Sequence, residues 1–183
     1  VLRRAVAIAN SLGLEGRPLV VYKNNSDGKG NSYGTHENYL VSRSVDFSHL
    51  VQSMAVHFLS RQIFCGAGKV GWETEALDDI APAFQIAQRS EFFEELVGLE
   101  TTLKRPIVNT RDEPHGDPDR FRRLHVIAGD ANMSHTATFV KLGSTALLLS
   151  ALEELGVERF PALPRFPVRA IREIGCDITL RVA

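Results

Sequence analysis

The sequence predicts an α+β fold in which a mostly antiparallel sheet is flanked by helices. Short apolar runs separated by turn-forming residues predict the strands, and two longer segments carry apolar residues at helical spacing. Strands separated by turns, together with two long helices, favour this class. The length of 183 residues is enough for one domain with a sizeable core.

The N-terminal part is expected to contain a helix, two strands and a polar loop. Residues 2–14 (LRRAVAIANSLGL) have helical periodicity that ends at Gly13. Pro18–Lys23 (PLVVYK) is a continuous apolar run, which is typical of a strand buried on both faces. Asn24–Gly34 is rich in residues that form tight turns, and His36–Ser42 alternates as a strand should.

A helix is predicted next, with Asp46 or Ser48 as its N-cap. Its apolar residues repeat at i, i+1, i+4 and i+5 and are expected to face the core: Leu50, Val51, Met54, Ala55, Phe58 and Leu59. Gly66, Gly68 and Gly71 follow in a GxGxxG pattern. No strand-then-helix context with a later ribose-binding acid accompanies them, so they indicate a glycine-rich connection rather than a dinucleotide site.

The second half is expected to supply the remaining strands and helices. Three strands are predicted, at Ala83–Ala87, Arg105–Asn109 and Leu124–Ala128. Asn132 or Ser134 caps a long helix that Gly156 ends. A proline-rich connection, Phe160–Pro167, then leads to a short helix at Val168–Ile174.

Composition excludes several classes of partner. The formal net charge is −1, so no overall field favours nucleic acid or an acidic membrane surface. No apolar run is long enough to span a bilayer, and the N-terminus has no signal-peptide pattern. Cys65 and Cys176 lie far apart without a CxxC motif, which predicts reduced thiols and a cytoplasmic protein.

The stretch from Arg105 to Gly143 concentrates cationic and metal-competent side chains. The guanidinium groups of Arg111, Arg120, Arg122 and Arg123 suit phosphate oxygens, because the guanidinium presents a planar fork with a permanent charge. Strand alternation places Arg123 on the same face as His125. The alternative is a salt-bridged surface whose partners would be Asp112, Glu113, Asp117 and Asp119.

The loop at Asn24–Gly34 is expected to face this stretch. Its backbone amides could hold a carboxylate or an acyl group by N–H donation. His36 follows directly and could bind a divalent cation, although a hydrogen-bonded structural histidine is the alternative. If the site exists, His36, Arg111, Arg123 and His125 should converge on one face of one sheet.

No catalytic nucleophile is predicted from the motifs. The sequence has no GxSxG, no HExxH and no P-loop. Glu73 and Glu75 have the spacing of a magnesium-binding ExE pair, but they are expected in a loop and rank low as ligands.

Long segments of the chain resemble the depupylase/Pup deamidase family, which is paired with the Pup ligases among the glutamine-synthetase-like carboxylate–amine ligases. The resemblance lies in YKNNSDGKGNSYGTHENYLVSR, in GAGKVG, in FQIAQRSEFFEELVGLETTLKRPIVNTRDEPHGDPDRFRRLHVIAGDANMSHTATFVKLG and in PVRAIREIGCD. DGKG, YGTHENY and FFEELVGLETTLKRPIVNTRDEPH favour the depupylase branch over the ligase. The resemblance implies a partial glutamine-synthetase-like catalytic fold, with this chain as its central segment.

The activity implied by the resemblance is nucleotide-dependent hydrolysis of amide bonds of Pup. The substrates would be the isopeptide bond between Pup and a protein lysine and the amide of Pup's C-terminal glutamine; the cofactors would be ATP (or ADP with phosphate) and Mg²⁺. Pup and pupylated proteins would be the partners, with no nucleic acid and no membrane. A Pup–protein ligase, or a catalytically incomplete fragment that binds nucleotide and Pup, is the alternative.

The resemblance also implies roles for individual residues. His36 and His125 would contact the metal, and Arg111 and Arg123 the nucleotide phosphates. The catalytic aspartate and the carboxylate metal ligands are expected outside this segment, so the isolated segment is expected to be inactive.

The substrate side of the implied site lies in the glycine-rich loop. By the same resemblance, Asn31 and Gly34 would hold the glutamyl group of the substrate.

Overall fold

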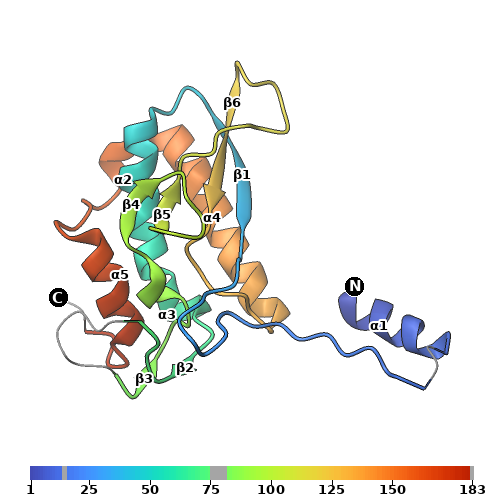
Figure 1. Cartoon of the computed structure of the whole chain (residues 1–183). Coiled ribbons are helices and arrows are strands. Elements are labelled where there is room, and N and C mark those ends of the chain that lie inside the picture. Colours follow the sequence, from blue (N-terminus) through green and yellow to red (C-terminus); the bar gives the residue numbers. More distant parts are fainter. Residues whose placement is uncertain (14–15, 75–81, 182–183) are drawn as a thin grey trace.

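The computed structural model describes residues 1–13, 16–74 and 82–181. The body of the molecule is a sheet with helices packed against it, and helix α1 (Leu2–Ser11) lies apart from that body (Figure 1). α1 ends just before Gly13, as predicted, and has no buried residue. None of the described helices is long and apolar enough to cross a bilayer.

The main sheet has four strands in the order β1-β6-β5-β4. These are β1 (Glu37–Ser42), β6 (Phe121–Val126), β5 (Pro106–Asn109) and β4 (Glu95–Gly98). β1 and β5 each pair with β6 antiparallel, and only β4 pairs parallel, with β5. The prediction of a mostly antiparallel sheet in an α+β fold is therefore confirmed.

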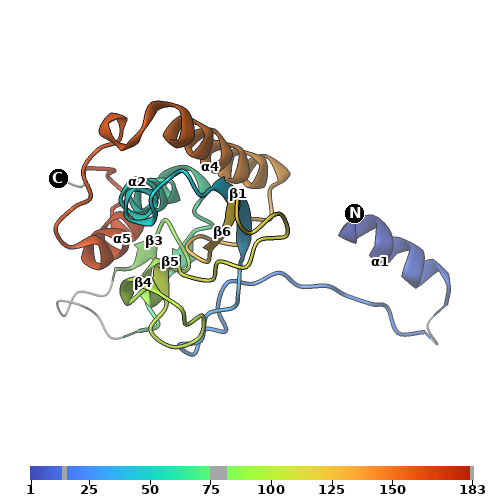
Figure 2. The ribbon, with the colours of Figure 1, turned by 90° about the horizontal axis from the view of Figure 1, so that it is seen from above.

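Three helices cover one face of this sheet: α2 (Phe47–Ser60), α4 (His135–Leu155) and α5 (Pro167–Cys176) (Figure 2). The core between the layers contains Val41 and Leu124 from the sheet. The short helix α3 (Gln62–Cys65) continues from α2, and two 3₁₀ turns lie at η1 (Ser90–Phe92) and η2 (Val157–Arg159).

The predicted starts of the two long helices are confirmed, because predicted capping residues lie at their N-termini. Asp46 is the N-cap of α2 and its carboxylate accepts the Ser48 N–H at 2.7 Å. Ser134 caps α4, and Gly156, with φ of +80°, follows its last residue. All of the apolar residues predicted to face the core from α2 are buried: Leu50, Val51, Met54, Ala55, Phe58 and Leu59.

The smaller strands differ in detail from the prediction. β6 begins at Phe121, before the predicted start, because this part of the strand pairs with Ser42 and its neighbours in β1. β3 (Phe84–Gln85) pairs with β2 (Lys69–Val70), which lies inside the glycine-rich connection. β4 was not among the predicted strands. Both cysteines are free thiols.

The prediction of a doubly buried strand at Pro18–Lys23 is wrong. The segment forms no strand, and Val20 and Tyr22 are 60% and 84% exposed. Its described backbone contacts are with Asn10 of α1, whose side chain bonds the Leu19 N–H and C=O. A strand needs a neighbour to complete its hydrogen bonds, and the apolar run by itself does not supply one.

Candidate functional site

Two imidazoles meet at the end of the sheet where β1 begins. His125 of β6 pairs across the ladder with Asn38, and His36 directly precedes β1. Nε2 of His125 lies 3.0 Å from Nδ1 of His36, and the ring centroids are 4.9 Å apart. His125 is buried, and its Nδ1 has no hydrogen-bond partner among the described residues. The two rings share one N–H···N bond, so one ring must donate a proton to the other.

The two predicted arginines act on this histidine pair. Burial is the main cause that lowers the pKa of His125 to about 4, and the charges of His36, Arg123 and Arg111 lower it further. Burial, followed by the charges of Arg89 and Arg111, also lowers the pKa of His36. Both rings are therefore neutral near pH 7. The structure brings His36 and His125 into contact, and Arg111 and Arg123 are near enough for their charges to act on His125; the convergence of all four on one sheet face and their roles stay a prediction.

The salt-bridge alternative also holds in part. Nη2 of Arg123 lies 2.6 Å from Oε2 of Glu113, but the Glu113 side chain is 81% exposed. Asp112 pairs with Arg43 and also accepts the backbone N–H of Arg123. An exposed pair of this kind contributes little energy, so the Arg123 guanidinium can exchange Glu113 for another anion.

Gly34 lies close to the imidazole ring of His36. A Cβ added at Gly34 would lie 3.1 Å from Nε2 of His36, so a glycine lets the loop pass close to the imidazole. Gly34, His36 and Glu37 line a cavity of about 660 Å³, together with Lys141. This cavity is the concave region next to the histidine pair.

Asn31 lies elsewhere, although it belongs to the same predicted loop. It lines a second cavity and does not line the one that contains Gly34. Its side chain donates to Asp27 at 2.7 Å, and its backbone N–H donates to the same carboxylate. The bridge between Ser26 and Ser32 folds the loop back on itself, which places Asn31 and Gly34 at different cavities.

Five backbone amides of the loop donate within the protein: those of Asp27, Lys29, Gly30, Asn31 and Tyr33. Asp27 accepts the N–H of Lys29 at 2.8 Å, and Glu73 accepts that of Gly30 at 3.1 Å. The N–H of Tyr33 donates to the carbonyl of Asn25. These five amides are committed within the protein, and binding of a substrate acyl group by the remaining amides of the loop stays a prediction.

Glu73 anchors the loop instead of binding a metal. Its carboxylate accepts from Ser26 Oγ at 2.6 Å and forms an ion pair with Lys69. Its low-ranked partner in the ExE pattern, Glu75, lies outside the described residues. Within residues 1–13, 16–74 and 82–181, no group of three or more His, Cys, Asp or Glu side chains could hold a metal ion.

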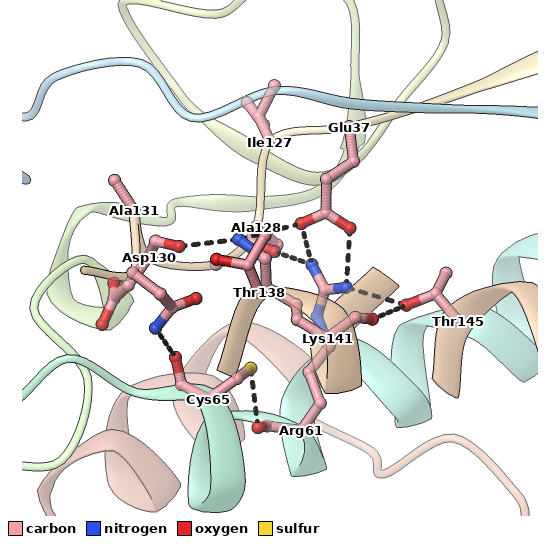
Figure 3. Close-up of polar contacts among 12 residues, drawn as sticks. Glu37, Arg61, Cys65, Ile127, Ala128, Asp130, Ala131, Thr138, Lys141 and Thr145 are labelled. Atoms are coloured by element: carbon pink, nitrogen blue, oxygen red, sulfur yellow. Dashed lines mark hydrogen bonds and ion pairs between the residues drawn. The ribbon is translucent and has the colours of Figure 1, made fainter. Parts of the chain in front are cut away.

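Two residues that line the first cavity, Glu37 and Lys141, belong to a buried polar network (Figure 3). Glu37 forms a bidentate pair with Arg61, at 2.9 Å to Nη1 and 2.8 Å to Nη2. Nζ of Lys141 lies 3.5 Å from the same carboxylate and donates to the carbonyl of Asp130 at 2.7 Å. Arg61 also donates to Thr145 Oγ1 and to the carbonyl of Ala128. The network joins β1, the end of α2, α4 and the segment after β6.

The charges in this network are held in their ionised forms by one another. Burial opposes ionisation of Glu37, but Arg61, Tyr39 and Lys141 outweigh it and lower the pKa of Glu37 below its usual value. Burial lowers the pKa of Lys141, and the negative charge of Glu37 opposes that shift. Sequence reasoning missed this network. Its only signal was a charged or hydroxyl side chain inside otherwise apolar helices, such as Lys141 and Thr145 at i, i+4 spacing.

The segment after β6 is fixed by a second buried carboxylate. Asp130 accepts the N–H groups of Ala67, Gln88 and Arg89 at 2.8–3.0 Å. Asn25 bonds both the N–H and the carbonyl of Ala131, which ties the glycine-rich loop to this segment. The wall of the first cavity is therefore set by buried hydrogen bonds rather than by an open loop.

Comparison with known proteins places this segment in a family. The Pup-ligase protein family matches residues 1–183. A depupylase of Acidothermus cellulolyticus is 54% identical over 166 residues, which cover 91% of this chain and 32% of that protein. A Pup–protein ligase of Acidimicrobium ferrooxidans is 49% identical over 162 residues, which cover 88% of this chain and 34% of that protein. The chain thus spans about a third of the length of these relatives.

A solved structure supports the same relationship. The structure of the Pup ligase PafA in complex with ADP has a TM-score of 0.74 and 42% sequence identity, over 97% of this chain and 38% of that one. The likeness confirms the fold class and agrees with the partial glutamine-synthetase-like fold that the sequence resemblance implied.

Removing one partner of the Glu37–Arg61 pair should destabilise the protein strongly. Arg61→Met leaves the buried Glu37 without its bidentate donor, and we expect a loss of about 3–5 kcal/mol of unfolding free energy. Glu37→Leu combined with Arg61→Met should cost less than the sum of the single changes. Urea unfolding measures all three. Arg43→Met, which removes a partly exposed pair with Asp112, is the matched control and should cost about 1 kcal/mol or less.

Acid should destabilise the protein through His57. This side chain is buried and bonds Thr145 Oγ1 at 2.9 Å; burial, then the charge of Arg61, lowers its pKa to about 4. The unfolded chain therefore takes up this proton first, so stability is full above about pH 6.5 and falls as the pH drops towards 4. Between pH 7 and 5, the unfolding free energy of His57→Gln should fall by about 1–2 kcal/mol less than that of the unchanged chain, as measured by urea unfolding. An equal fall in unfolding free energy for His57→Gln and the unchanged chain would contradict this account. His49→Gln, at an exposed position, is the control and should behave like the unchanged chain.

Proposed function

The chain belongs to the Pup-ligase protein family, and we propose that it is part of a nucleotide-dependent depupylase and Pup deamidase. The proposal rests mainly on the higher identity to a depupylase, 54% against 49% for a Pup–protein ligase. The reaction would be hydrolysis of the isopeptide bond between Pup and a protein lysine, and of the amide of Pup's C-terminal glutamine. Pup and pupylated proteins would be the partners, in the cytoplasm.

Arg111 and Arg123 are proposed to contact the nucleotide phosphates. Both lie close enough to His125 for their charges to lower its pKa, so they present positive charge at the same place. Among the described residues, the ion-pair partner of the Arg123 guanidinium is the exposed carboxylate of Glu113, which phosphate oxygens can displace. The ADP bound to the related Pup ligase supports a nucleotide as the ligand.

His36 and His125 are proposed as nitrogen ligands at the metal side of the site. Neutral imidazole is the form that binds metals, and burial with nearby positive charge keeps both rings neutral near pH 7. The orphaned Nδ1 of His125 shows that this pair is not fully satisfied by the described protein groups.

This donor set fits Mg²⁺ poorly. Mg²⁺ prefers oxygen ligands, whereas two imidazoles suit ions such as Mn²⁺ or Zn²⁺. The nearby carboxylate of Glu37 is committed to Arg61. We therefore derive no catalytic step through Mg²⁺ at the histidine pair.

The part of the mechanism that these residues can perform is binding and orientation. The guanidinium groups of Arg111 and Arg123 can hold an anion without releasing a proton. The pair Glu37–Arg61 fixes the strand end that carries His36, so the imidazole keeps its position. We identify no catalytic residue in the chain, and we propose that the isolated chain hydrolyses neither substrate.

The second candidate is a Pup–protein ligase, which the 49% identity and the PafA structure favour. It would use the same nucleotide-binding arginines, but it would form an isopeptide bond rather than hydrolyse one. A catalytically incomplete fragment that binds only nucleotide and Pup is the third candidate.

The reaction separates these candidates. We expect the parent protein that carries this segment to release ammonia from Pup ending in glutamine, and to release Pup from a pupylated protein, when ATP is present. Mass spectrometry of the products measures both reactions. Attachment of glutamate-ended Pup to a lysine, coupled to ATP turnover, would instead identify a ligase. Hydrolysis by the 183-residue chain alone would contradict the division of roles proposed above.

Nucleotide binding tests the proposed arginines. Arg111→Gln and Arg123→Gln should each weaken ADP binding by the parent protein about tenfold, because each removes charge-assisted hydrogen bonds. The exposed Arg165→Gln is the matched control and should leave the dissociation constant unchanged. Calorimetric titration gives these constants. Full affinity in both site variants would exclude the phosphate role, whatever reaction the parent protein catalyses.

A further inference from the structure

The tip of the glycine-rich loop, residues 26–31, is held to the rest of the protein by one side chain. Oγ of Ser26 donates to the carboxylate of Glu73 at 2.6 Å, and the N–H of Gly30 donates to it at 3.1 Å. Asp27 accepts N–H groups from within the tip, so it shapes the turn without attaching it to another segment. Among the described residues, Glu73 is the one hydrogen-bond partner that the tip has outside the loop.

Glu73 is itself held by Lys69. Nζ of Lys69 lies 2.5 Å from Oε1 of Glu73 and also forms an ion pair with Glu91. Lys69 lies on β2 opposite Gln85 of β3, whose side-chain amide donates to Glu91 as well, at 3.1 Å. The same Nζ is 5.1 Å from the centre of the Phe92 ring. One ammonium group, on a side chain that is only 9% exposed, therefore joins two carboxylates.

The protein holds these two carboxylates with unequal strength. Glu91 is fully buried and accepts the N–H groups of Glu73 and Thr74, at 2.8 and 2.9 Å, and the hydroxyl of Thr74 at 3.1 Å. The described donors to the Glu73 carboxylate, apart from Lys69, both lie in the loop tip. Without the ammonium group, two negative charges would face each other in a poorly solvated place. Glu73 would then move, because fewer fixed groups hold it, and the loop tip would follow.

Both carboxylates depend on Lys69 for their charge. Burial raises the pKa of Glu73 and of Glu91, but Lys69 is the largest of the causes that outweigh it, so the pKa of each lies below its usual value. The charge of Glu91 also acts on Arg172, after that of Glu94. Glu91 therefore has a second cation nearby, whereas Lys69 is the cation that forms an ion pair with Glu73.

Lys69 lines neither of the two large cavities, although the loop that it holds borders both. Gly34 lines the first cavity, and Gly30 and Asn31 line the second, of about 590 Å³. A side chain outside a cavity affects binding there through the groups that it positions. For Lys69, those groups are Glu73 and, through it, the loop tip.

We propose that Lys69 is a positioning residue for substrate binding, which fixes the loop tip by holding Glu73 beside Glu91. The inference rests on the proposed function in one respect: it takes Asn31, at the tip, as a residue that contacts the glutamyl group of the substrate. The ammonium group acts on the loop, so its removal should weaken the binding of Pup and leave nucleotide binding at Arg111 and Arg123 unchanged.

Hydrogen exchange measures whether Lys69 fixes the tip, whatever reaction the parent protein catalyses. In Lys69→Met, peptides that cover residues 26–31 should exchange their amides about tenfold faster by mass spectrometry, because the N–H of Gly30 loses a fixed acceptor. Peptides from α2 should exchange as in the unchanged parent protein. The exposed Lys104→Met is the matched control and should change neither rate. Unchanged exchange at the tip in Lys69→Met would overturn the proposal.

A double variant separates positioning by charge from loss of packing around the lysine stem. When Glu73→Gln is added to Lys69→Met, an uncharged amide faces Glu91, and its oxygen can still accept the N–H of Gly30. Exchange at the tip should return to within about twofold of that in the unchanged parent protein. If packing were the cause, the double variant would exchange as fast as Lys69→Met, and that result would count against the proposal.

The affinity for Pup tests the substrate role. Calorimetric titration of the parent protein with glutamine-ended Pup, in the presence of ADP, should show about tenfold weaker binding in Lys69→Met and recovery in the double variant. The dissociation constant of ADP should stay the same. Faster exchange at the tip with unchanged affinity for Pup would overturn the role in substrate binding. A parent protein that binds Pup in this Lys69-dependent way but hydrolyses nothing would refute the hydrolase function and support the positioning role, so the two failures are distinguishable.

Discussion

The buried pair between Glu37 and Arg61 is the interaction on which the rest of the structure depends. It joins the first residue of β1 to the residue after α2, and Arg61 extends it to Thr145 of α4 and to the carbonyl of Ala128. An ion pair in the interior gains little net stability, because both charges lose their hydration. Its consequence is specificity: one register of β1 lets Glu37 reach Arg61, and that register places His36 beside His125.

The same pair sets the electrostatics of the surrounding core. Arg61 and Lys141 bring two positive charges to a single carboxylate, Glu37, and each also donates one hydrogen bond to a carbonyl, that of Ala128 or Asp130. After burial itself, the charge of Arg61 lowers the pKa of His57 and keeps its imidazole neutral, while the charge of Glu37 opposes this shift.

Local rules predicted the elements whose ends and faces are set by nearby residues. Asp46 and Gly156 mark helix ends through short-range hydrogen bonds and backbone conformation, so both could be read from the sequence. Pro18–Lys23 could not, because whether an apolar run becomes a buried strand depends on which segment lies beside it. Glu37 was missed for a similar reason. Nothing in the residues around it shows that Arg61, far along the chain, will reach it.

The glycine-rich loop shows why composition alone does not define a binding site. Its residues indicated a set of free amides, but the folded loop uses several of them to hold its own shape. The N–H of Gly30 goes to Glu73, which Lys69 holds in turn. The loop therefore acts as a fixed wall between chemically different regions, with neutral imidazoles beside Gly34 and guanidinium groups beside Asn31. The bonded amides of Gly30 and Asn31 have no further proton to offer a ligand, so recognition beside Asn31 depends more on side chains than the composition of the loop suggested.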